Sequence, residues 1–130
     1  MRYGYTIIYV SSVEETLEFY EEAFGFRIKF LNDDKSYGEL DTGGTTLAFA
    51  SHVLGAMNLG GSYERMDARG EPVGMELAFV TDDVVAAYDK ALASGAVALK
   101  APEHKPWGQL VGYVRALDGS VIELCSPMGG

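Results

Sequence analysis

Two glutamates in the second half of the chain are the first candidates for chemistry. Glu76 alternates with the apolar residues of the strand-like segment 75–80, and Glu123 alternates with those of 121–125, so each is predicted on the face opposite the apolar set. Carboxylates that share one cleft repel each other, and one of the two pKa values should then rise. Such a pair can form a poor metal site, do acid/base or ligand-binding work, or only hydrogen-bond to neighbours such as Arg115. The residues leave all three interpretations open.

Aromatic residues form the second group of candidates. Tyr5 and Tyr9 lie four residues apart in one strand-like segment and therefore share a face, as do Tyr113 and Arg115, two residues apart. Trp107 lies in the loop before the second pair. Aromatic walls with a few polar groups suit a planar or partly apolar ligand, so these residues, with the two glutamates, form the predicted ligand cleft. Some of the tyrosines are equally expected to be core residues with their hydroxyls at its edge.

Other residue types that carry chemistry are sparse. His52 and His104 lie in predicted loops, where a lone histidine is expected to face solvent. The single cysteine, Cys125, lies in an apolar strand and is expected to be a core residue without a disulfide. The sequence contains no glycine-rich phosphate loop and no Gly-x-Ser-x-Gly motif. These absences argue against nucleotide hydrolases and serine esterases.

The composition limits the partners. The net charge of −9 repels nucleic-acid backbones and anionic lipids, so neither nucleic acid nor a membrane is an expected partner. The same charge would favour a cationic ligand, although solubility alone accounts for it more simply. No apolar run approaches the about 20 residues of a membrane helix, and the first residues lack the layout of a signal peptide. A cytoplasmic location is therefore expected.

A repeat of secondary structure must position these residues. The first half predicts a helix that Ser11 or Ser12 caps and Gly25 ends. That helix follows one strand and precedes three, which are predicted at 5–10, 26–31, 36–41 and 45–50.

The second half repeats this order about 70 residues later. Its helix runs through Tyr88 and Leu92 and stops at Gly95, and its strands are predicted at 76–80, 96–100, 110–116 and 120–125. The glycine-rich segment 51–73 joins the halves and is expected to be a loop or an irregular lid.

Several motifs resemble one protein family. Residues 10–26, with Phe19-Tyr20 before Phe24-Gly25-Phe26, resemble the first helix of the vicinal oxygen chelate superfamily, which comprises glyoxalases, bleomycin resistance proteins and extradiol dioxygenases. Residues 80–84 resemble the entry to that family's second module, and residues 105–109 and 118–124 resemble its closing hairpin. One fold hosts many reactions, so these motifs are informative about the fold rather than the chemistry.

The resemblance implies an α+β fold of two βαβββ modules that form an open, partly barrel-like mixed sheet with a cleft. The 130 residues suit a single domain over 1–130. Within it, the first module is expected at about 1–50, the linker or lid at about 51–73, and the second module at about 74–130.

The resemblance also indicates where a metal would bind. In metal-using members, each module supplies one ligand from its first strand and one from its last, and the corresponding positions here are Tyr5, Ala48, Glu76 and Glu123. Only Glu123 matches the usual ligand type, because Tyr5 and Glu76 stand where histidine is usual and Ala48 has no ligating atom. A divalent metal is therefore disfavoured, with Glu76 and Glu123 as weak candidate ligands, and no other cofactor is expected.

The function implied by the resemblance is metal-independent binding of a small molecule, similar to the bleomycin resistance proteins, with sequestration of a cationic or aromatic compound. The alternative is a glyoxalase-like lyase or dioxygenase with a non-standard metal site, in which Glu123 is a ligand or base, Glu76 a second carboxylate and Tyr5 an acid. A third possibility is an interaction module without catalysis. A homodimer is expected, because sheets of this family often complete their clefts across a dimer.

Overall fold

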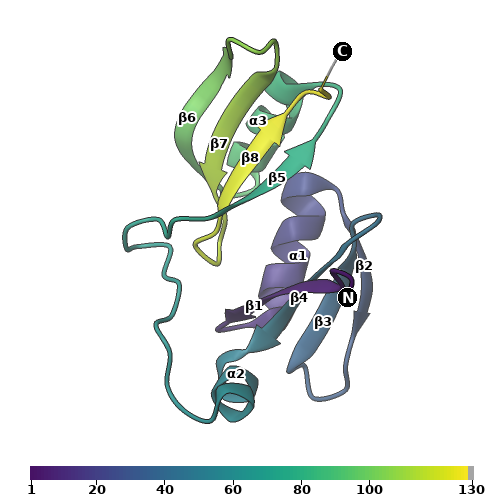
Figure 1. The fold of residues 1–130 in the computed structure, drawn as a ribbon, viewed down its shortest axis with the longest axis vertical. Helices are drawn as coiled ribbons and strands as arrows, with labels where there is room; N and C mark the ends of the chain where they lie inside the picture. The colour runs from purple at the N-terminus through teal and green to yellow at the C-terminus, as the bar shows by residue number, and fades with distance from the viewer. Residues whose placement is uncertain (129–130) are drawn as a thin grey trace. The chain divides into compact units, whose positions relative to one another are not determined.

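The computed structural model describes residues 1–128 and divides into two compact units, Met1–Met66 and the chain from Asp67 onwards. Each unit contains a four-stranded mixed sheet with one long helix against it (Figure 1). This arrangement confirms the predicted α+β fold of two repeated βαβββ modules. No helix among residues 1–128 is long and apolar enough to span a membrane.

The first unit begins with β1 (Tyr5–Val10) and α1 (Val13–Phe24). It continues with β2 (Arg27–Leu31), β3 (Tyr37–Asp41), β4 (Thr46–Ser51) and α2 (His52–Leu59). The strand order is β1-β4-β3-β2, in which β1 and β4 are parallel and the other neighbours are antiparallel.

The sequence around α1 explains its limits and its packing. The Ser12 hydroxyl accepts a hydrogen bond from the Glu15 backbone N–H, and Gly25 ends the helix at a φ of 77°, where a side chain would be strained. The buried face of α1 packs on the sheet through aromatic rings, with the Tyr20 and Phe49 centroids 4.8 Å apart. This packing forms the core of the first unit.

The second unit contains β5 (Glu76–Val80), α3 (Val84–Ala93), β6 (Val97–His104), β7 (Leu110–Arg115) and β8 (Val121–Cys125). Its strand order, β5-β8-β7-β6, repeats that of the first unit, again with one parallel pair, β5 and β8. The Asp83 carboxylate caps α3 by accepting from the Ala86 backbone N–H at 3.1 Å. Val84, Tyr88 and Ala91 form the buried face of this helix.

Two elements differ from the sequence-based prediction. The segment 51–73 was expected to be irregular, but its first part is the helix α2. A Cβ at Gly55 would lie 2.7 Å from the Tyr63 hydroxyl oxygen and 2.8 Å from Cγ of Tyr9, so the glycine serves close packing and does not break the helix. The strand β6 extends to His104, beyond the predicted end at 100, because register shifts on this edge strand accommodate Pro102.

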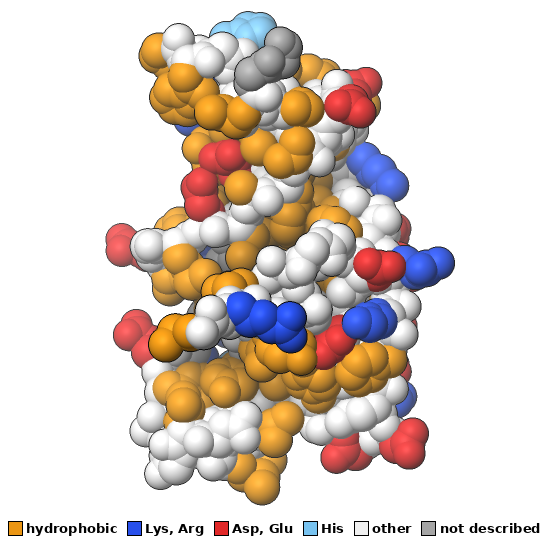
Figure 2. All heavy atoms as spheres, turned by 45° about the vertical axis from the view of Figure 1, so that its right-hand side comes forward, with side chains coloured by type: hydrophobic (Ala, Val, Ile, Leu, Met, Phe, Trp, Pro, Cys, Tyr) orange, Lys and Arg blue, Asp and Glu red, His pale blue; other side chains and the backbone are white. Residues whose placement is uncertain are grey.

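Hydrophobic side chains reach the surface of both units. On the face shown in Figure 2 they lie between separate acidic and basic groups. The exposed ones include three residues of α2, namely Val53, Met57 and Leu59, and residues of the edge strands β1 and β5, namely Tyr5, Ile7 and Val80. Edge strands with exposed apolar residues are a common basis for association.

Candidate functional site

The sheet of the second unit has one face covered by α3 and one open face. A Cβ at Gly112 would meet the Tyr88 ring of α3 at 3.1 Å, so Gly112 and its cross-strand partner Leu124 lie on the covered face. The next residues along these strands, Tyr113 and Glu123, pair with each other and therefore lie on the open face.

Glu123 is the centre of a polar cluster on this open face. The Tyr113 hydroxyl donates to Oε1 of Glu123 at 3.1 Å, and both side chains are half-buried. Glu76 approaches Glu123 from the neighbouring strand β5. We call Glu76, Tyr113 and Glu123 the carboxylate cluster. The strand alternation in the sequence thus correctly placed both glutamates on one face.

The two carboxylates influence each other and their neighbours. Desolvation, followed by the hydrogen bond to Glu123 and the charge of Glu123, raises the pKa of Glu76, as the sequence predicted for one member of the pair. Burial, the hydrogen bond to Glu123 and its charge raise the pKa of Tyr113 to about 12. The same three causes raise the pKa of the Cys125 thiol to about 11, so this buried cysteine is a poor nucleophile.

The carboxylate cluster has no ion pair within the described part of the chain. Among residues 1–128, no lysine or arginine lies within ion-pair distance of Glu76 or Glu123. A shared proton, or a positive group from outside the chain, would relieve the repulsion between the two carboxylates.

Arg115 does not have the role that the sequence suggested. It is only 6% exposed, and its guanidinium donates to three backbone carbonyls: Nε to Gly119 at 2.9 Å, Nη1 to Gly70 at 3.1 Å and Nη2 to Asp67 at 3.0 Å. Arg115 therefore does not pair with the glutamates, and its hydrogen bonds are structural.

Trp107 lies in the loop between β6 and β7, as predicted, and is 62% exposed. Its indole N–H donates to Oε1 of Gln109 at 2.7 Å, and the Gln109 amide donates to the Ser126 carbonyl at 2.8 Å. This chain of hydrogen bonds orients the indole and leaves much of its ring accessible to a ligand. No hydrogen bond within residues 1–128 joins Trp107 to the carboxylate cluster.

The first unit has different residues at the corresponding positions. Tyr5 pairs across the strands with the residue two positions before Ala48. Glu76 likewise pairs with the residue two positions before Glu123. Tyr5 therefore corresponds to Glu76, and Ala48 corresponds to Glu123. Ala48 is fully buried, whereas Tyr5 is 61% exposed. The first unit therefore has no carboxylate at either of these two positions.

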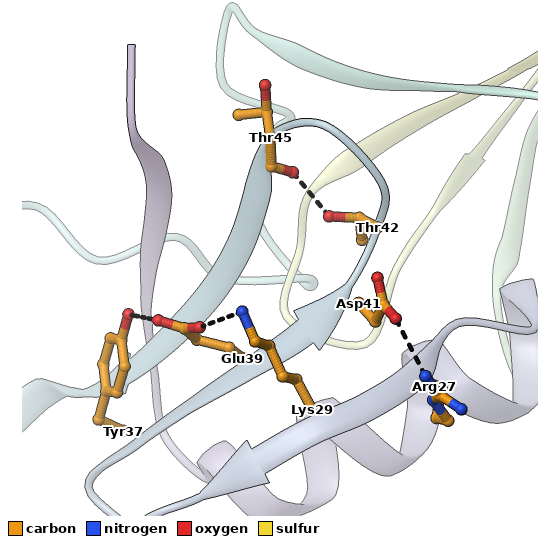
Figure 3. Close-up of polar contacts among 7 residues, drawn as sticks. All are labelled: Arg27, Lys29, Tyr37, Glu39, Asp41, Thr42 and Thr45. Atoms are coloured by element: carbon orange, nitrogen blue, oxygen red, sulfur yellow. Dashed lines mark hydrogen bonds and ion pairs between the residues drawn. The ribbon is translucent and has the colours of Figure 1, made fainter. Parts of the chain in front are cut away.

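A different polar group lies on the third strand of the first unit, and the sequence reasoning missed it. Glu39 pairs with Ala48 across the strands, so it corresponds to Tyr113 of the second unit. The Tyr37 hydroxyl donates to Oε2 of Glu39 at 2.6 Å, and Nζ of Lys29 lies 3.8 Å from Oε1 (Figure 3). Burial, the hydrogen bond to Glu39 and the charge of Glu39 raise the pKa of Tyr37. The alternation of Tyr37 and Glu39 in β3 was the available signal.

Tyr9 and His52 belong to a packed cluster in the first unit. The Tyr9 and Tyr63 ring centroids lie 5.2 Å apart, and Nδ1 of His52 lies 2.6 Å from the Tyr63 hydroxyl oxygen. His52 is 8% exposed, which contradicts its predicted solvent-facing position. Burial, followed by the positive charge of Arg65, lowers the pKa of His52. These contacts hold the segment after α2 against β1.

Comparison with known proteins assigns the family. The sequence model of the Glyoxalase/Bleomycin resistance protein/Dioxygenase superfamily matches residues 2–124. The chain belongs to this superfamily.

Similar proteins support the same fold. A glyoxalase-related enzyme from Fulvimarina pelagi superposes with a TM-score of 0.82 at 23% identity, over 98% of this chain and 88% of that chain. A protein of unknown function from Agrobacterium tumefaciens str. C58 superposes with a TM-score of 0.78 at 27% identity, over 98% and 95% of the two chains. YraH of Bacillus subtilis (strain 168) is 25% identical over 116 residues, which cover 88% of this chain and 90% of YraH.

The residues of this superfamily member do not fit the metal site of its metal-using relatives. At the four corresponding positions, Ala48 offers no donor atom and Tyr5 offers a phenol instead of an imidazole. The raised pKa of Glu76 further disfavours the charged form that a metal ligand requires. Within residues 1–128, no three His, Cys, Asp or Glu side chains gather closely enough to hold an ion.

Proposed function

We propose that the open face of the second unit binds a small organic cation, and that Glu76 and Glu123 recognise its positive charge. The observation that carries this proposal is the contact between two carboxylates that form no ion pair with any lysine or arginine of the described residues. An ammonium or guanidinium group of a ligand can replace the shared proton and form charge-assisted hydrogen bonds to both carboxylates.

Aromatic side chains favour a ligand that is partly flat and apolar. Tyr113 is part of the carboxylate cluster, and the Trp107 ring is largely exposed with its N–H already bonded. Aromatic faces attract cations and stack on planar groups. The ligand class that this chemistry fits best is a cationic compound with an aromatic or apolar body, which the protein would sequester.

Binding in this proposal needs no metal. The charge that a divalent ion supplies in metal-using members of the superfamily comes instead from the ligand. This part of the proposal is supported by the donor set, in which two carboxylates remain and imidazole is absent from all four corresponding positions.

Calorimetry on the full chain, pretreated with a chelator, tests the proposal. Benzylamine and benzyl alcohol serve as a charged probe and a neutral probe of similar shape. Glu123→Gln and Glu76→Gln should each weaken benzylamine binding by about tenfold, or 1.4 kcal/mol, and leave benzyl alcohol unaffected. Glu103→Gln is the matched control, because it removes one exposed negative charge from the same unit.

A broader panel of cationic, aromatic and metal-chelating compounds extends this test. Raised melting temperatures for cationic aromatic compounds would support sequestration. Absence of binding across the whole panel, or equal binding of the charged and neutral probes, would contradict the proposal.

We further propose that the binder is a homodimer. The strands β1 and β5 each have a neighbour on only one side in their own sheets, and both expose apolar residues, including Ile7 and Val80. Size-exclusion chromatography with light scattering should give the mass of two chains at micromolar concentration, and the mass of one chain would refute the dimer.

A cytoplasmic location also forms part of the proposal. It is supported by the acidic composition and by the single cysteine, Cys125, which is buried and free. Fractionation of expressing cells, with the protein found outside the cytoplasmic fraction, would contradict it.

The second candidate function is a glyoxalase-like lyase or dioxygenase with a non-standard metal site. The observation in its favour is that Glu123 occupies a ligand position of the superfamily, with the Tyr113 hydroxyl bonded to it. The protein should be purified without added metal, assayed for metal content, and then assayed for lactoylglutathione lyase activity with nickel, zinc, manganese or iron. Near-stoichiometric metal that Glu123→Gln removes would favour this function over metal-independent binding.

A further inference from the structure

Arg115 is a buried cation that forms no ion pair with a carboxylate among residues 1–128. Its side chain instead joins two segments of backbone through three carbonyls. Nε binds the carbonyl of Gly119, in the turn between β7 and β8, while Nη1 and Nη2 bind the carbonyls of Gly70 and Asp67. Buried arginine usually has an acidic partner, so its use on backbone carbonyls calls for a structural explanation.

The segment that Arg115 holds is a compact turn. The Gly70 N–H donates to the Asp67 carbonyl at 3.0 Å, and the Arg69 N–H donates to Oδ1 of Asp67 at 2.9 Å. The Asp67 carbonyl therefore accepts from both Gly70 and Arg115. Because both ends of the turn are bonded to one planar guanidinium, the turn is fixed against β7.

This turn leads directly to the carboxylate cluster. Glu76 is the first residue of β5, and β5 is an edge strand whose one neighbour in its sheet is β8. The chain between the turn and the strand has one short backbone contact, from the Met75 N–H to the Val73 carbonyl at 2.8 Å. The start of an edge strand frays readily unless the chain before it is held.

We infer that Arg115 is a positioning residue: it fixes the turn at residues 67–70 and thereby holds the start of β5, so that Glu76 stays beside Glu123. The importance of Arg115 for binding rests on the proposed function, because Glu76 is one of the two proposed recognition groups. The position of Glu76 in the free protein can be tested without a ligand.

Lysine cannot replace arginine in this role. The guanidinium reaches three carbonyls at once because its donors lie in a rigid plane, whereas an ammonium presents one point charge on a flexible stem. Arg115→Lys keeps the charge and most of the stem, so it separates the three-way bonding from simple electrostatics. Arg115→Gln removes the charge as well.

Amide hydrogen exchange on the free, full chain tests the first step. In the wild type, the Gly70 amide should be protected more strongly than the Gly108 amide, which closes a similar turn by donating to the Lys105 carbonyl. Arg115→Lys and Arg115→Gln should each speed exchange at Gly70 by about tenfold, with Gly108 as the internal control that stays unchanged. If Gly70 exchanged as freely as Gly108 in the wild type, the inference would fail even without a folded variant.

Carboxyl-carbon NMR tests the second step. In the Arg115 variants, the titration midpoint of Glu76 should move down towards its ordinary value of 4.5, because Glu76 is no longer held beside Glu123. Glu103, whose pKa Lys105 and Lys100 lower, should titrate as in the wild type. An unchanged Glu76 midpoint together with faster Gly70 exchange would show that Arg115 stabilises the turn without positioning Glu76. Failure of ligand binding alone would contradict the proposed function and leave this inference intact.

Discussion

The sheet faces opposite α1 and α3 share one strand order but have opposite electrostatic arrangements. In the first unit, the buried carboxylate of Glu39 has a tyrosine donor and a nearby lysine. In the second unit, Glu123 has a tyrosine donor and a second carboxylate, Glu76, and neither carboxylate has an ion pair among residues 1–128. The two units therefore share a strand order, but the first has a carboxylate paired with a lysine. The second has two carboxylates that form no ion pair within residues 1–128.

This difference shows how a duplicated fold separates structure from function. A carboxylate paired within its own unit contributes to the local structure, because its polar atoms are satisfied without a ligand. An uncompensated pair costs free energy in the free protein, and that cost is recovered when a cation binds. The proposed binding site accordingly belongs to the second unit, and variants of the two units should behave differently.

Core truncation should give the largest effect and should be similar in the two units. Phe49 and Leu124 occupy corresponding positions on β4 and β8, and each is at most 2% exposed. Phe49→Ala should lower the free energy of unfolding by about 3–5 kcal/mol and Leu124→Ala by about 2–5 kcal/mol, measured by urea titration. Val53→Ala, on the exposed side of α2, is the control and should change it by less than about 0.5 kcal/mol. A loss below about 1 kcal/mol at Phe49 would mean that this core is wrongly described.

Removing each tyrosine hydroxyl should distinguish the two units. Tyr37→Phe leaves the buried Glu39 carboxylate without its tyrosine donor, so it should cost about 1.5–3 kcal/mol of unfolding free energy. Tyr113→Phe should cost less, about 0.5–1.5 kcal/mol, because Glu123 is only half-buried and water can replace the hydroxyl. Chemical denaturation at neutral pH measures both. A larger loss for Tyr113→Phe would reverse the comparison.

A lysine placed in the second unit should make it resemble the first. Ala78 lies directly opposite Glu123 on β5 and is exposed, so Ala78→Lys brings a cation beside the carboxylate cluster. Affinity for benzylamine should fall by about tenfold, or 1.4 kcal/mol, because the internal ammonium competes with the ligand. Ala78→Gln controls for side-chain size. Equal loss of affinity in both variants would indicate steric blocking instead of charge compensation.

The pH dependence should give the smallest effect, with opposite signs for two glutamates of the second unit. The pKa of Glu76 is raised on folding, so its contribution to stability is present at low pH and is lost as the pH rises through the folded value. Relative to Glu76→Gln, the free energy of unfolding of the wild type should fall by roughly a few tenths of a kcal/mol between pH 4 and 7. The change is small because solvent screens the exposed side chain.

Glu103 provides the opposite case. Its pKa is lowered by Lys105 and Lys100, so its contribution is present at neutral pH and is lost as the pH falls through the folded value. The wild type should therefore gain stability relative to Glu103→Gln as the pH rises. Thermal melts of both variants across this range give the two slopes, and slopes of the same sign would contradict the assigned shifts.

The features that local sequence patterns determine were predictable. Strand alternation placed Glu76 and Glu123 on one face, and the capping residues and Gly25 gave the limits of α1 correctly. These predictions succeeded because the period of a strand and the chemistry of a helix end depend on residues that are close in sequence.

The features that were missed depend on contacts between distant segments. Gly55 indicated a loop, but the close approach of Tyr9 and Tyr63 requires a glycine within α2. The sequence suggested the glutamates as partners of Arg115, but its partners Asp67 and Gly70 precede it by 48 and 45 residues. Neither partner could be identified from spacing alone, because no local pattern specifies which carbonyl a guanidinium will meet.

We expect Glu76 and Glu123 to act as one pair without an ion-pair partner in the metal-free protein. Carboxyl-carbon NMR titration of the chelator-treated chain, with and without Glu123→Gln, tests it most directly. The Glu76 midpoint should lie above 4.5 in the wild type and should fall when Glu123 loses its charge. A Glu76 midpoint at or below 4.5 in the wild type, or one that Glu123→Gln does not change, would contradict it.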